Sequence, residues 1–507
     1  MIRKNCYSSH AVFAALTSLI FLISGCNSRP TVTPSLTSTP SVPPTHISIP
    51  SVTPTFTAEP APFTSVTLKP GDLYFSVDGK QSSIFSRNIA GLQQTDYELF
   101  LDRTKAGGSK FVRIQLDNIG GIGFTRTGEV DPNWLAQWDR IFDKAEEDGI
   151  YVLPVFSTWY DWNNGNPDMG YSTWRNNQVN QANGGFVKSP AEIFQKGSKA
   201  HTMWMNWIET LVNHWHVRKN ILAWEVFSEV NLASGSTETT GIDFVNNTAA
   251  LIRSIDPGRL VTASIADCPP GSGACYWPHF YKQTNIDFME MHPYTSQLDR
   301  VLISEVRKNL GNYQKPVLIG ESGLSAATPD SVAGKLTVIK NAPIGVKHAI
   351  WASIVSGAMN GRSLWWEDGY GIYFPKLGIP WLQQYITSEM PAVNFVDGND
   401  FSGFKPLTTS TSPGIWGAAI GNEKYIIGWF RDATCEPPDW NLKSILSRQT
   451  VTIIVPGSAS NWQIDFYNTK TGTDIISSIT ISTKSNTATI PLPDFTDDIA
   501  FKMFIQK

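Results

Sequence analysis

Between about residues 66 and 398 the sequence alternates short apolar segments with amphipathic helical segments, and no other feature constrains the fold as much. The segments with the length and composition of strands are 88–91, 111–116, 151–157, 221–229, 260–266, 286–294, 316–321 and 363–366. Helical periodicity is clear at 134–147, 201–215, 244–255, 301–310 and 338–356. Eight strands with intervening helices predict an α/β fold, a (β/α)8 TIM barrel, rather than a doubly wound sheet. No G-x-G-x-x-G follows an early strand, which argues against a dinucleotide-binding fold.

The pattern changes near residue 399. Short runs of alternating apolar and polar residues follow, without helical periodicity, at 424–429, 450–455, 462–467, 474–481 and 487–490. Such runs predict a small C-terminal β-sandwich over residues 399–507. The sequence does not decide whether this domain binds sugar or only packs against the barrel, and a packing role is favoured.

The first 65 residues have the composition of an export and tether segment. Arg3 and Lys4 precede an apolar run at 11–23, which is too short to span a bilayer comfortably. Ile-Ser-Gly-Cys then ends at Cys26 and resembles a bacterial lipobox, whose cysteine is lipidated after cleavage. Residues 27–65 are rich in Ser, Thr and Pro and predict a disordered linker. We therefore expect a lipoprotein signal at 1–26 and a mature protein in the bacterial cell envelope, outside the cytoplasm, touching the membrane only through its lipid.

Charge and cysteine content exclude several classes of function. The formal net charge of −4 argues against a nucleic-acid partner, because binding driven by phosphate contacts needs a basic chain. Five cysteines are too few for a disulfide framework, although Cys268 and Cys275 could close a small loop in an oxidising compartment. No C-x-x-C or H-E-x-x-H motif is present, so we expect no metal and no cofactor. A tethered monomer is the default expectation.

Two glutamates end apolar strands that a barrel would bring to one mouth. Glu229 closes the fourth strand and Glu321 closes the seventh. Two carboxylates about 5–5.5 Å apart suit glycoside hydrolysis with retention, in which one attacks the sugar and the other carries the proton. Arg113, on the inward face of the second strand, is placed to keep Glu321 ionised. Glu225 and Glu290 lie within the barrel and are expected to be buried partners of Arg113 rather than catalysts.

Strand alternation assigns side chains to the barrel interior. Residues that share an inward face are 111, 113, 115 and 117 in the second strand, 225, 227 and 229 in the fourth, and 288, 290, 292 and 294 in the sixth. Polar residues at the ends of these faces lie where barrel enzymes place their chemistry. Trp159, Tyr160 and Trp162 follow the third strand on the same side, where aromatic rings can stack on sugars.

Several of these motifs resemble a known family. WEVFSEVN resembles the W-E-x-x-N-E acid/base motif of clan A glycoside hydrolases, and PVLIGESG resembles their nucleophile strand. VRIQ, MHPY and SLWW resemble the corresponding strands of glycoside hydrolase family 5, the cellulase and mannanase family, and the resemblance spans about 310 residues. It implies Glu229 as acid/base and Glu321 as nucleophile. It also implies that His292 and Tyr294 orient the carboxylates and that Trp365 or Trp366 floors the subsite where the bond breaks.

One position departs from the family pattern. Ser228 stands where the family has an asparagine that holds the sugar 2-hydroxyl. A water could bridge the gap, or the preferred sugar could differ at C2. We expect a retaining β-glycoside hydrolase acting on a β-linked polysaccharide or oligosaccharide such as mannan or glucan. The alternatives are a catalytically weak or inactive carbohydrate-binding surface lipoprotein, for which Ser228 is the only support, and a transglycosylase with the same residues.

Overall fold

The computed structural model describes residues 63–89, 94–116, 123–165, 173–267, 273–324, 341–364, 387–457, 461–483 and 485–506. The predicted signal, the lipidation site Cys26 and almost all of the predicted linker lie outside these ranges. Within them, no helix combines the length and the apolar character that crossing a membrane requires.

Eight parallel strands form a barrel. They are β3 (Ile84–Ile89), β4 (Phe111–Gln115), β5 (Tyr151–Val155), β6 (Ala223–Glu225), β7 (Leu260–Thr262), β8 (Met289–Met291), β10 (Val317–Ile319) and β12 (Asn360–Leu364). Six pair in the order β12-β3-β4-β5-β6-β7, and β10 pairs with β8. Backbone hydrogen bonds from Asp287 N to Val261 O (2.9 Å) and from Met359 N to Val317 O (2.8 Å) connect the two sheets and close the ring. The predicted fold class is confirmed.

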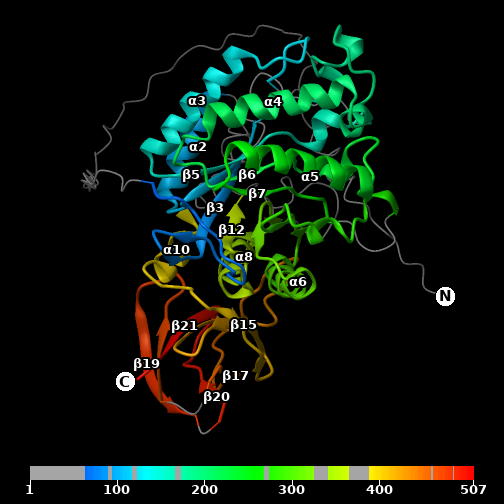
Figure 1. Cartoon of the computed structure of the whole chain (residues 1–507). Helices are drawn as coiled ribbons and strands as arrows, with labels where there is room; N and C mark the ends of the chain where they lie inside the picture. The colour runs from blue at the N-terminus through cyan, green and yellow to red at the C-terminus, as the bar shows by residue number, and fades with distance from the viewer. Residues whose placement is uncertain are drawn as a thin grey trace, which may run out of the picture.

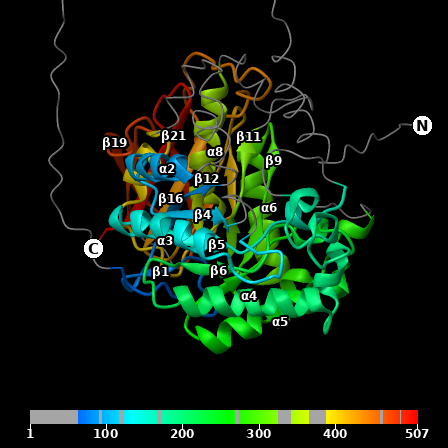
Figure 2. The same ribbon diagram turned by 90° about the horizontal axis from the view of Figure 1, so that it is seen from above.

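Helices pack around the outside of the barrel (Figures 1 and 2). They are α2 (Gln94–Ala106), α3 (Pro132–Glu147), α4 (Lys199–Trp215), α5 (Glu238–Ile255), α6 (Leu298–Tyr313), α8 (Ala342–Ser356) and α10 (Met390–Val396). Short 3-10 turns lie in the loops, at η3 (Trp159–Trp162), η4 (Trp174–Asn176), η5 (Gln181–Asn183), η6 (Pro190–Phe194), η7 (Val230–Leu232), η8 (Gly273–Cys275) and η9 (Phe280–Lys282). In the described part of the β7–β8 connection the only helical turns are η8 and η9. Cys275 is disulfide-bonded, whereas Cys268, its suggested partner, lies outside the described residues.

Helix α3 illustrates how local sequence sets these elements. Asp131 caps its N-terminus by accepting hydrogen bonds from the backbone of Asn133 and Trp134, and Pro132 occupies the first turn. Its buried side chains recur at helical spacing and face the strands: Trp134, Trp138, Ile141, Phe142 and Ala145.

Several predicted strand bounds need correction. The eighth strand begins at Asn360 instead of 363, and the predicted sixth strand is divided into β8 and β9 (Tyr294–Thr295). The first strand begins at Ile84, before the predicted 88–91, because its early residues pair with β12 and cross the apolar end of the barrel. The fourth strand ends at Glu225, so the alternation predicted through 229 fails. Phe227 is fully buried outside the barrel, 6.0 Å from Trp204 and 6.1 Å from Phe244 between ring centroids.

The N-terminal end of the barrel is closed by an apolar plug. The segment from Phe63 through the hairpin β1 (Ser76–Val77) and β2 (Lys80–Gln81) covers this end. The Phe75 ring is fully buried and lies edge-on to Phe111 and Phe288, at centroid distances of 6.4 and 5.5 Å. All chemistry described below lies at the opposite, C-terminal end of the strands.

The C-terminal domain is a β-sandwich, as predicted. One sheet has the order β13-β15-β16-β21-β18-β19 and the other the order β14-β17-β20. The strands are β13 (Lys405–Pro406), β14 (Thr409–Thr411), β15 (Ile415–Gly421), β16 (Tyr425–Asp432), β17 (Thr450–Ile454), β18 (Asn461–Tyr467), β19 (Ile475–Ser482), β20 (Thr487–Pro491) and β21 (Asp498–Ile505). The five predicted runs correspond to β16 to β20, whereas β13, β14, β15 and β21 were not predicted.

The larger sheet packs one face inside the sandwich and the other against the barrel. Its barrel-facing residues join the barrel core: Ala418, Ile420, Ile427, Trp429 and Ala500. Figure 1 shows this sheet next to α8 and α6. Lys347 of α8 lies 2.7 Å from Asp497 and 2.5 Å from Asp498, and Asp498 accepts a hydrogen bond from Trp429. The domain therefore has an extensive packing role.

Candidate active site

The C-terminal ends of several barrel strands bring charged side chains together. Strand β4 provides Arg113 and Gln115, β6 provides Glu225, and the turn after β6 provides Ser228 and Glu229. Strand β8 provides Glu290, the segment after it His292, β9 (Tyr294–Thr295) Tyr294, and the segment after β10 Glu321. Except for Glu229 and Tyr294, which are partly exposed, these residues are buried. The sequence-predicted carboxylates and their supporting residues are thus assembled at one place.

Arg113 is the centre of this assembly. Its Nε and Nη2 donate to the two oxygens of Glu225, each at 2.7 Å, and Nε also lies 3.2 Å from Glu290. Its Nη1 donates to Glu321 (2.8 Å), and Nη2 donates to Ser228 Oγ (2.9 Å). Burial would lower the pKa of Arg113, but the neighbouring carboxylates raise it well above the usual value. The expectation that Glu225 and Glu290 are buried partners of Arg113 agrees with these contacts.

Glu321 is held by donors on both of its oxygens. Oε1 accepts from Arg113 and from Gln115 Nε2 (3.1 Å), and Oε2 accepts from the Tyr294 hydroxyl (2.5 Å). Burial would raise the pKa of Glu321, yet the positive charges of His292 and Arg113 and the Tyr294 hydrogen bond together lower it. Glu321 is therefore ionised at neutral pH.

Gly320, directly before Glu321, is required by a close approach. A Cβ at this position would lie 2.2 Å from Glu290 Oε2 and 3.1 Å from His292 Nε2. A side chain here would displace two members of the charged assembly, which gives the Gly-Glu pair in PVLIGESG a physical reason.

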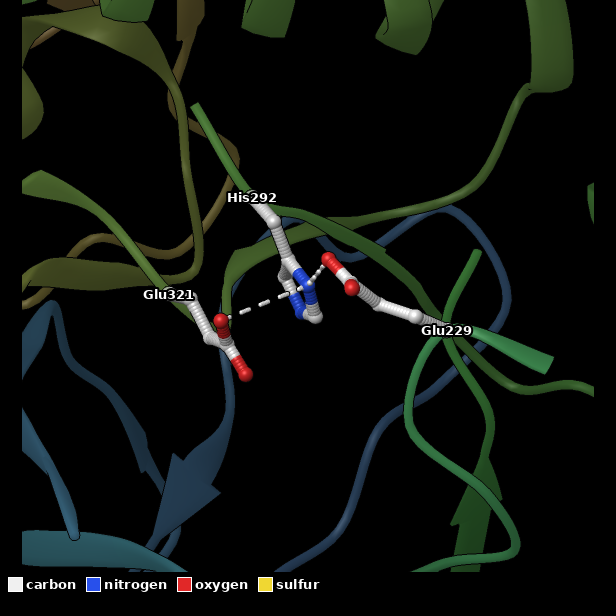
Figure 3. Close-up of side chains that lie close together, drawn as sticks. All are labelled: Glu229, His292 and Glu321. Carbon is white, nitrogen blue, oxygen red and sulfur yellow. Dashed lines mark hydrogen bonds and ion pairs between the residues drawn. The ribbon is translucent and has the colours of Figure 1, made fainter. Parts of the chain in front are cut away.

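Glu229 has a different setting. Its backbone is left-handed (φ 56°, ψ 47°), and its carboxylate accepts a 2.9 Å hydrogen bond from His292 Nδ1. Figure 3 shows the imidazole between the carboxylates of Glu229 and Glu321. His292 Nδ1 is 3.8 Å from Glu321 Oε2, and an oxygen of Glu229 lies within 4.8 Å of one of Glu321. This separation is short enough for one carboxylate to attack a sugar carbon while the other serves the leaving oxygen.

His292 supplies positive charge between the two carboxylates. Burial would lower its pKa, but the charge of Glu321, the hydrogen bond to Glu229 and the nearby carboxylate of Glu290 (3.8 Å) raise it to about 10. Glu229, His292 and Glu321 also have the spacing of a three-ligand cation site. His292 Nδ1, which faces both carboxylates, is already hydrogen-bonded to Glu229 (2.9 Å).

The residues match the family model described as cellulase, glycosyl hydrolase family 5, over residues 76–356, which is more than half of the chain. The chain belongs to glycosyl hydrolase family 5. The resemblance seen in its motifs is thereby confirmed.

This family 5 chain is also similar to individual known proteins. It is 25% identical over 214 residues to a probable mannan endo-1,4-beta-mannosidase F of Neosartorya fischeri, covering 38% of this chain and 43% of that protein. It thus spans less than half the length of this curated relative.

Two solved structures share the fold. One is described as a glycoside hydrolase, with a TM-score of 0.57, 11% identity and coverage of 87% of this chain and 97% of that one. The other is a glycoside hydrolase family 5 protein from Bacteroides vulgatus, with a TM-score of 0.56, 14% identity and coverage of 87% and 94%.

The other predicted site residues of this family 5 chain divide into three groups. Trp159 is partly exposed, and its backbone N donates to Ser228 O (3.2 Å), so it borders the carboxylates. Trp162 is fully buried with its Nε1 bonded to Ser157 Oγ (3.0 Å), which corrects the expectation that it stacks on sugar. Trp365 and Trp366 lie outside the described residues.

Sequence reasoning missed two polar residues of the site, Asn88, which accepts from Arg113 Nη1 (2.9 Å), and Ser264. Ser264 lies two residues beyond β7 and bonds to both Glu225 and Glu229. The strand alternation offered one signal, because Leu260, Thr262 and Ser264 share the inward side. A single serine belongs to no recognisable motif, however, so this signal was not used.

Proposed function

We propose that this protein is a retaining β-glycoside hydrolase that acts on a β-linked polysaccharide or oligosaccharide, with β-mannan and β-glucan as the leading candidates. The observation that carries this proposal is the close approach of Glu229 and Glu321, within 4.8 Å between oxygens, with His292 between them. Family membership and the probable mannan endo-1,4-beta-mannosidase relative support the substrate class.

The proposed reaction is a double displacement. Glu321, ionised beside Arg113, attacks the anomeric carbon while Glu229 gives its proton to the leaving oxygen, and a glycosyl ester forms on Glu321. Glu229 then takes a proton from water, the water attacks the same carbon, and Glu321 is released. Tyr294 and Gln115 hold the carboxylate of Glu321 in line for the attack.

The contacts of Ser228 do not support the alternative that the protein is catalytically inactive. Its hydroxyl oxygen accepts from Arg113 Nη2 at 2.9 Å, and both carboxylates keep their partners beside it. A Ser228 side chain held this way is a member of the charged assembly. The nature of the sugar at C2 is the property we expect Ser228 to influence.

The test is release of reducing sugar by the purified protein from β-mannans, β-glucans, xylans and galactans, with Glu321→Ala beside it. Release by the parent protein and its loss in the variant would support the proposal and give the sugar class. Proton NMR of the first product would then show whether the β-configuration is retained. Binding to one of these substrates without turnover would favour the carbohydrate-binding alternative, and lengthened oligosaccharide products would favour a transglycosylase.

We also propose that the mature protein is anchored at the outside of the cell envelope through Cys26. The support is the charged start, the apolar run and the Ile-Ser-Gly-Cys sequence. Metabolic labelling with a fatty-acid analogue tests it. Label in the full chain, and its loss in Cys26→Ala, is the expected result.

A further inference from the structure

Ser264 is hydrogen-bonded to the turn that carries Glu229, although the two residues are 35 positions apart in the sequence. Its backbone N donates to Phe227 O (3.0 Å), and its backbone O accepts from Val230 N (3.1 Å). Its side-chain Oγ accepts from Glu229 N (3.0 Å) and donates to Glu225 Oε1 (3.0 Å). Ser264 is fully buried, so water does not compete for these bonds.

The turn needs such support because Glu229 has a left-handed backbone. At φ 56° and ψ 47° a residue with a Cβ is sterically disfavoured and persists only where its surroundings fix it. Three of the bonds from Ser264 hold the carbonyl of Phe227, two residues before Glu229, the N–H of Glu229 itself and the N–H of Val230 after it. The direction in which the Glu229 side chain leaves the backbone is set by that conformation.

The hydroxyl of Ser264 has a fixed polarity. A backbone N–H can only donate, so Oγ must accept from Glu229, and its own proton is then free to go to Glu225. Glu225 is in turn held by Nε and Nη2 on one edge of the Arg113 guanidinium, and Nη1 of the same group donates to Glu321. One chain of hydrogen bonds therefore joins the backbone of one candidate catalytic carboxylate to the side chain of the other.

We propose that Ser264 is a positioning residue that sets the aim of the Glu229 carboxyl toward the leaving oxygen. The inference rests on the proposed glycosidase function. Loss of the hydroxyl would leave Glu225 and the amide of Glu229 each without this partner, and only the two backbone bonds of residue 264 would then hold the left-handed turn. Proton transfer by Glu229 would then suffer more than attack by Glu321.

The experiment compares substrates with different leaving groups, because this separates the contribution of proton transfer by Glu229 from that of attack by Glu321. The value of kcat/KM reports the chemistry up to formation of the glycosyl ester. A poor leaving group, such as a sugar or alkyl alcohol, needs the proton from Glu229, whereas a dinitrophenyl leaving group does not. Ser264→Ala should lower kcat/KM on the poor leaving group on the order of 10- to 100-fold. It should change kcat/KM on the dinitrophenyl glycoside less than about threefold.

Two further variants make the result specific. Ser264→Thr keeps the hydroxyl and should recover most of the lost activity. Thr262→Val is the matched control, because Thr262 is a buried hydroxyl residue at the end of β7, two residues before Ser264. Its backbone pairs with Glu225 in the sheet, but its hydroxyl donates to Phe288 O (2.8 Å) and not to Glu225 or Glu229. It should leave the ratio of the two kcat/KM values unchanged. If Ser264→Ala does not fold, Ser264→Cys, which keeps the volume and weakens the hydrogen bonds, takes its place.

The outcomes are distinguishable. An equal fall on both substrates, or a Thr262→Val variant that behaves like Ser264→Ala, would overturn the positioning role while leaving the glycosidase function intact. A parent protein without turnover on any glycoside would overturn both. A selective fall on the poor leaving group, recovered by threonine, is the result that this inference requires.

Discussion

The two candidate catalytic carboxylates lie within 4.8 Å of each other, yet their surroundings differ. Glu321 receives hydrogen bonds from Arg113, Gln115 and Tyr294, and its side chain is 5% exposed. The carboxylate of Glu229 receives one from His292, and its side chain is 15% exposed. The first setting holds a permanent anion, and the second leaves a carboxyl free to meet water or a leaving oxygen. Their environments, more than their residue type, support the two different roles proposed for them.

The largest loss of activity should come from replacing Glu321, the ionised carboxylate. Glu321→Ala should lower kcat by roughly 10⁴- to 10⁶-fold, because no other group in this setting can form the glycosyl ester. Added azide should then attack the anomeric carbon from the face that Glu321 occupied, which would give a glycosyl azide of inverted configuration. Activity assays and NMR of the azide product test this. An azide product of retained configuration would mean that Glu321 is not the nucleophile.

Removing the other carboxylate should give a smaller and different defect. Glu229→Ala should lower kcat/KM on poor leaving groups about 10²- to 10⁴-fold and leave dinitrophenyl glycosides far less affected. Without Glu229 to activate water, the glycosyl ester is hydrolysed slowly. Added azide should therefore speed turnover and give a product of retained configuration. Opposite azide stereochemistry in the two alanine variants is the sharpest check of the comparison, and identical stereochemistry would break it.

His292 belongs to both settings and should link pH to stability. Its pKa is about 10 in the folded protein against an ordinary value of 6.5, so its contribution is complete below pH 6.5 and is lost as the pH rises toward 10. The free energy of unfolding should therefore fall by on the order of a few kcal/mol over this window. Chemical denaturation of the parent and of His292→Gln at several pH values measures it.

The control for this pH effect is another buried histidine. His201 bonds to Ile193 O (2.8 Å) and lies apart from the carboxylates. His201→Gln should keep the decline of stability with pH, and His292→Gln should flatten it. The same slope in all three proteins would show that His292 does not carry the proton.

The smallest loss of activity should follow from removing one of the hydrogen bonds donated to Glu321, the one from the Tyr294 hydroxyl. Tyr294→Phe removes a hydrogen bond that lowers the pKa of Glu321, so the acid limb of kcat/KM should move to higher pH and kcat should fall about tenfold. Tyr425→Phe is the matched control, since its hydroxyl bonds to Asn399 (3.0 Å) and lies away from the site. An acid limb that stays in place would indicate that Arg113 and His292 alone keep Glu321 ionised.

Much of this arrangement could be predicted from the sequence, since period-two alternation ending in charged residues is a strong signal of barrel strands. The inward faces of β4 and β8 placed Arg113, Glu290, His292 and Tyr294 correctly. Alternation failed after Glu225 because the chain leaves the strand there and enters a left-handed turn at Glu229. Such turns are stabilised by residues that are distant in sequence, here Ser264, and these contacts cannot be predicted from the pattern of neighbouring residues.

Burial explains the remaining errors. Trp162 lies three residues after Trp159 in the same 3-10 turn, yet a bond to Ser157 and packing 5.8 Å from the ring of Trp174 place it in the core. The strand β21 was missed because it is buried along most of its length and shows little alternation. It packs in the middle of its sheet, between β16 and β18, where both faces are covered.

The closed end of the barrel has a practical consequence. Phe63 is the first described residue, and the segment that follows it seals the barrel opposite to the carboxylates. A bead, sensor surface or fusion partner joined upstream of Phe63 would therefore meet the sealed end first and leave the catalytic end accessible to polymers. Coupling through the N-terminal side is the orientation we recommend for immobilising this protein on a solid support.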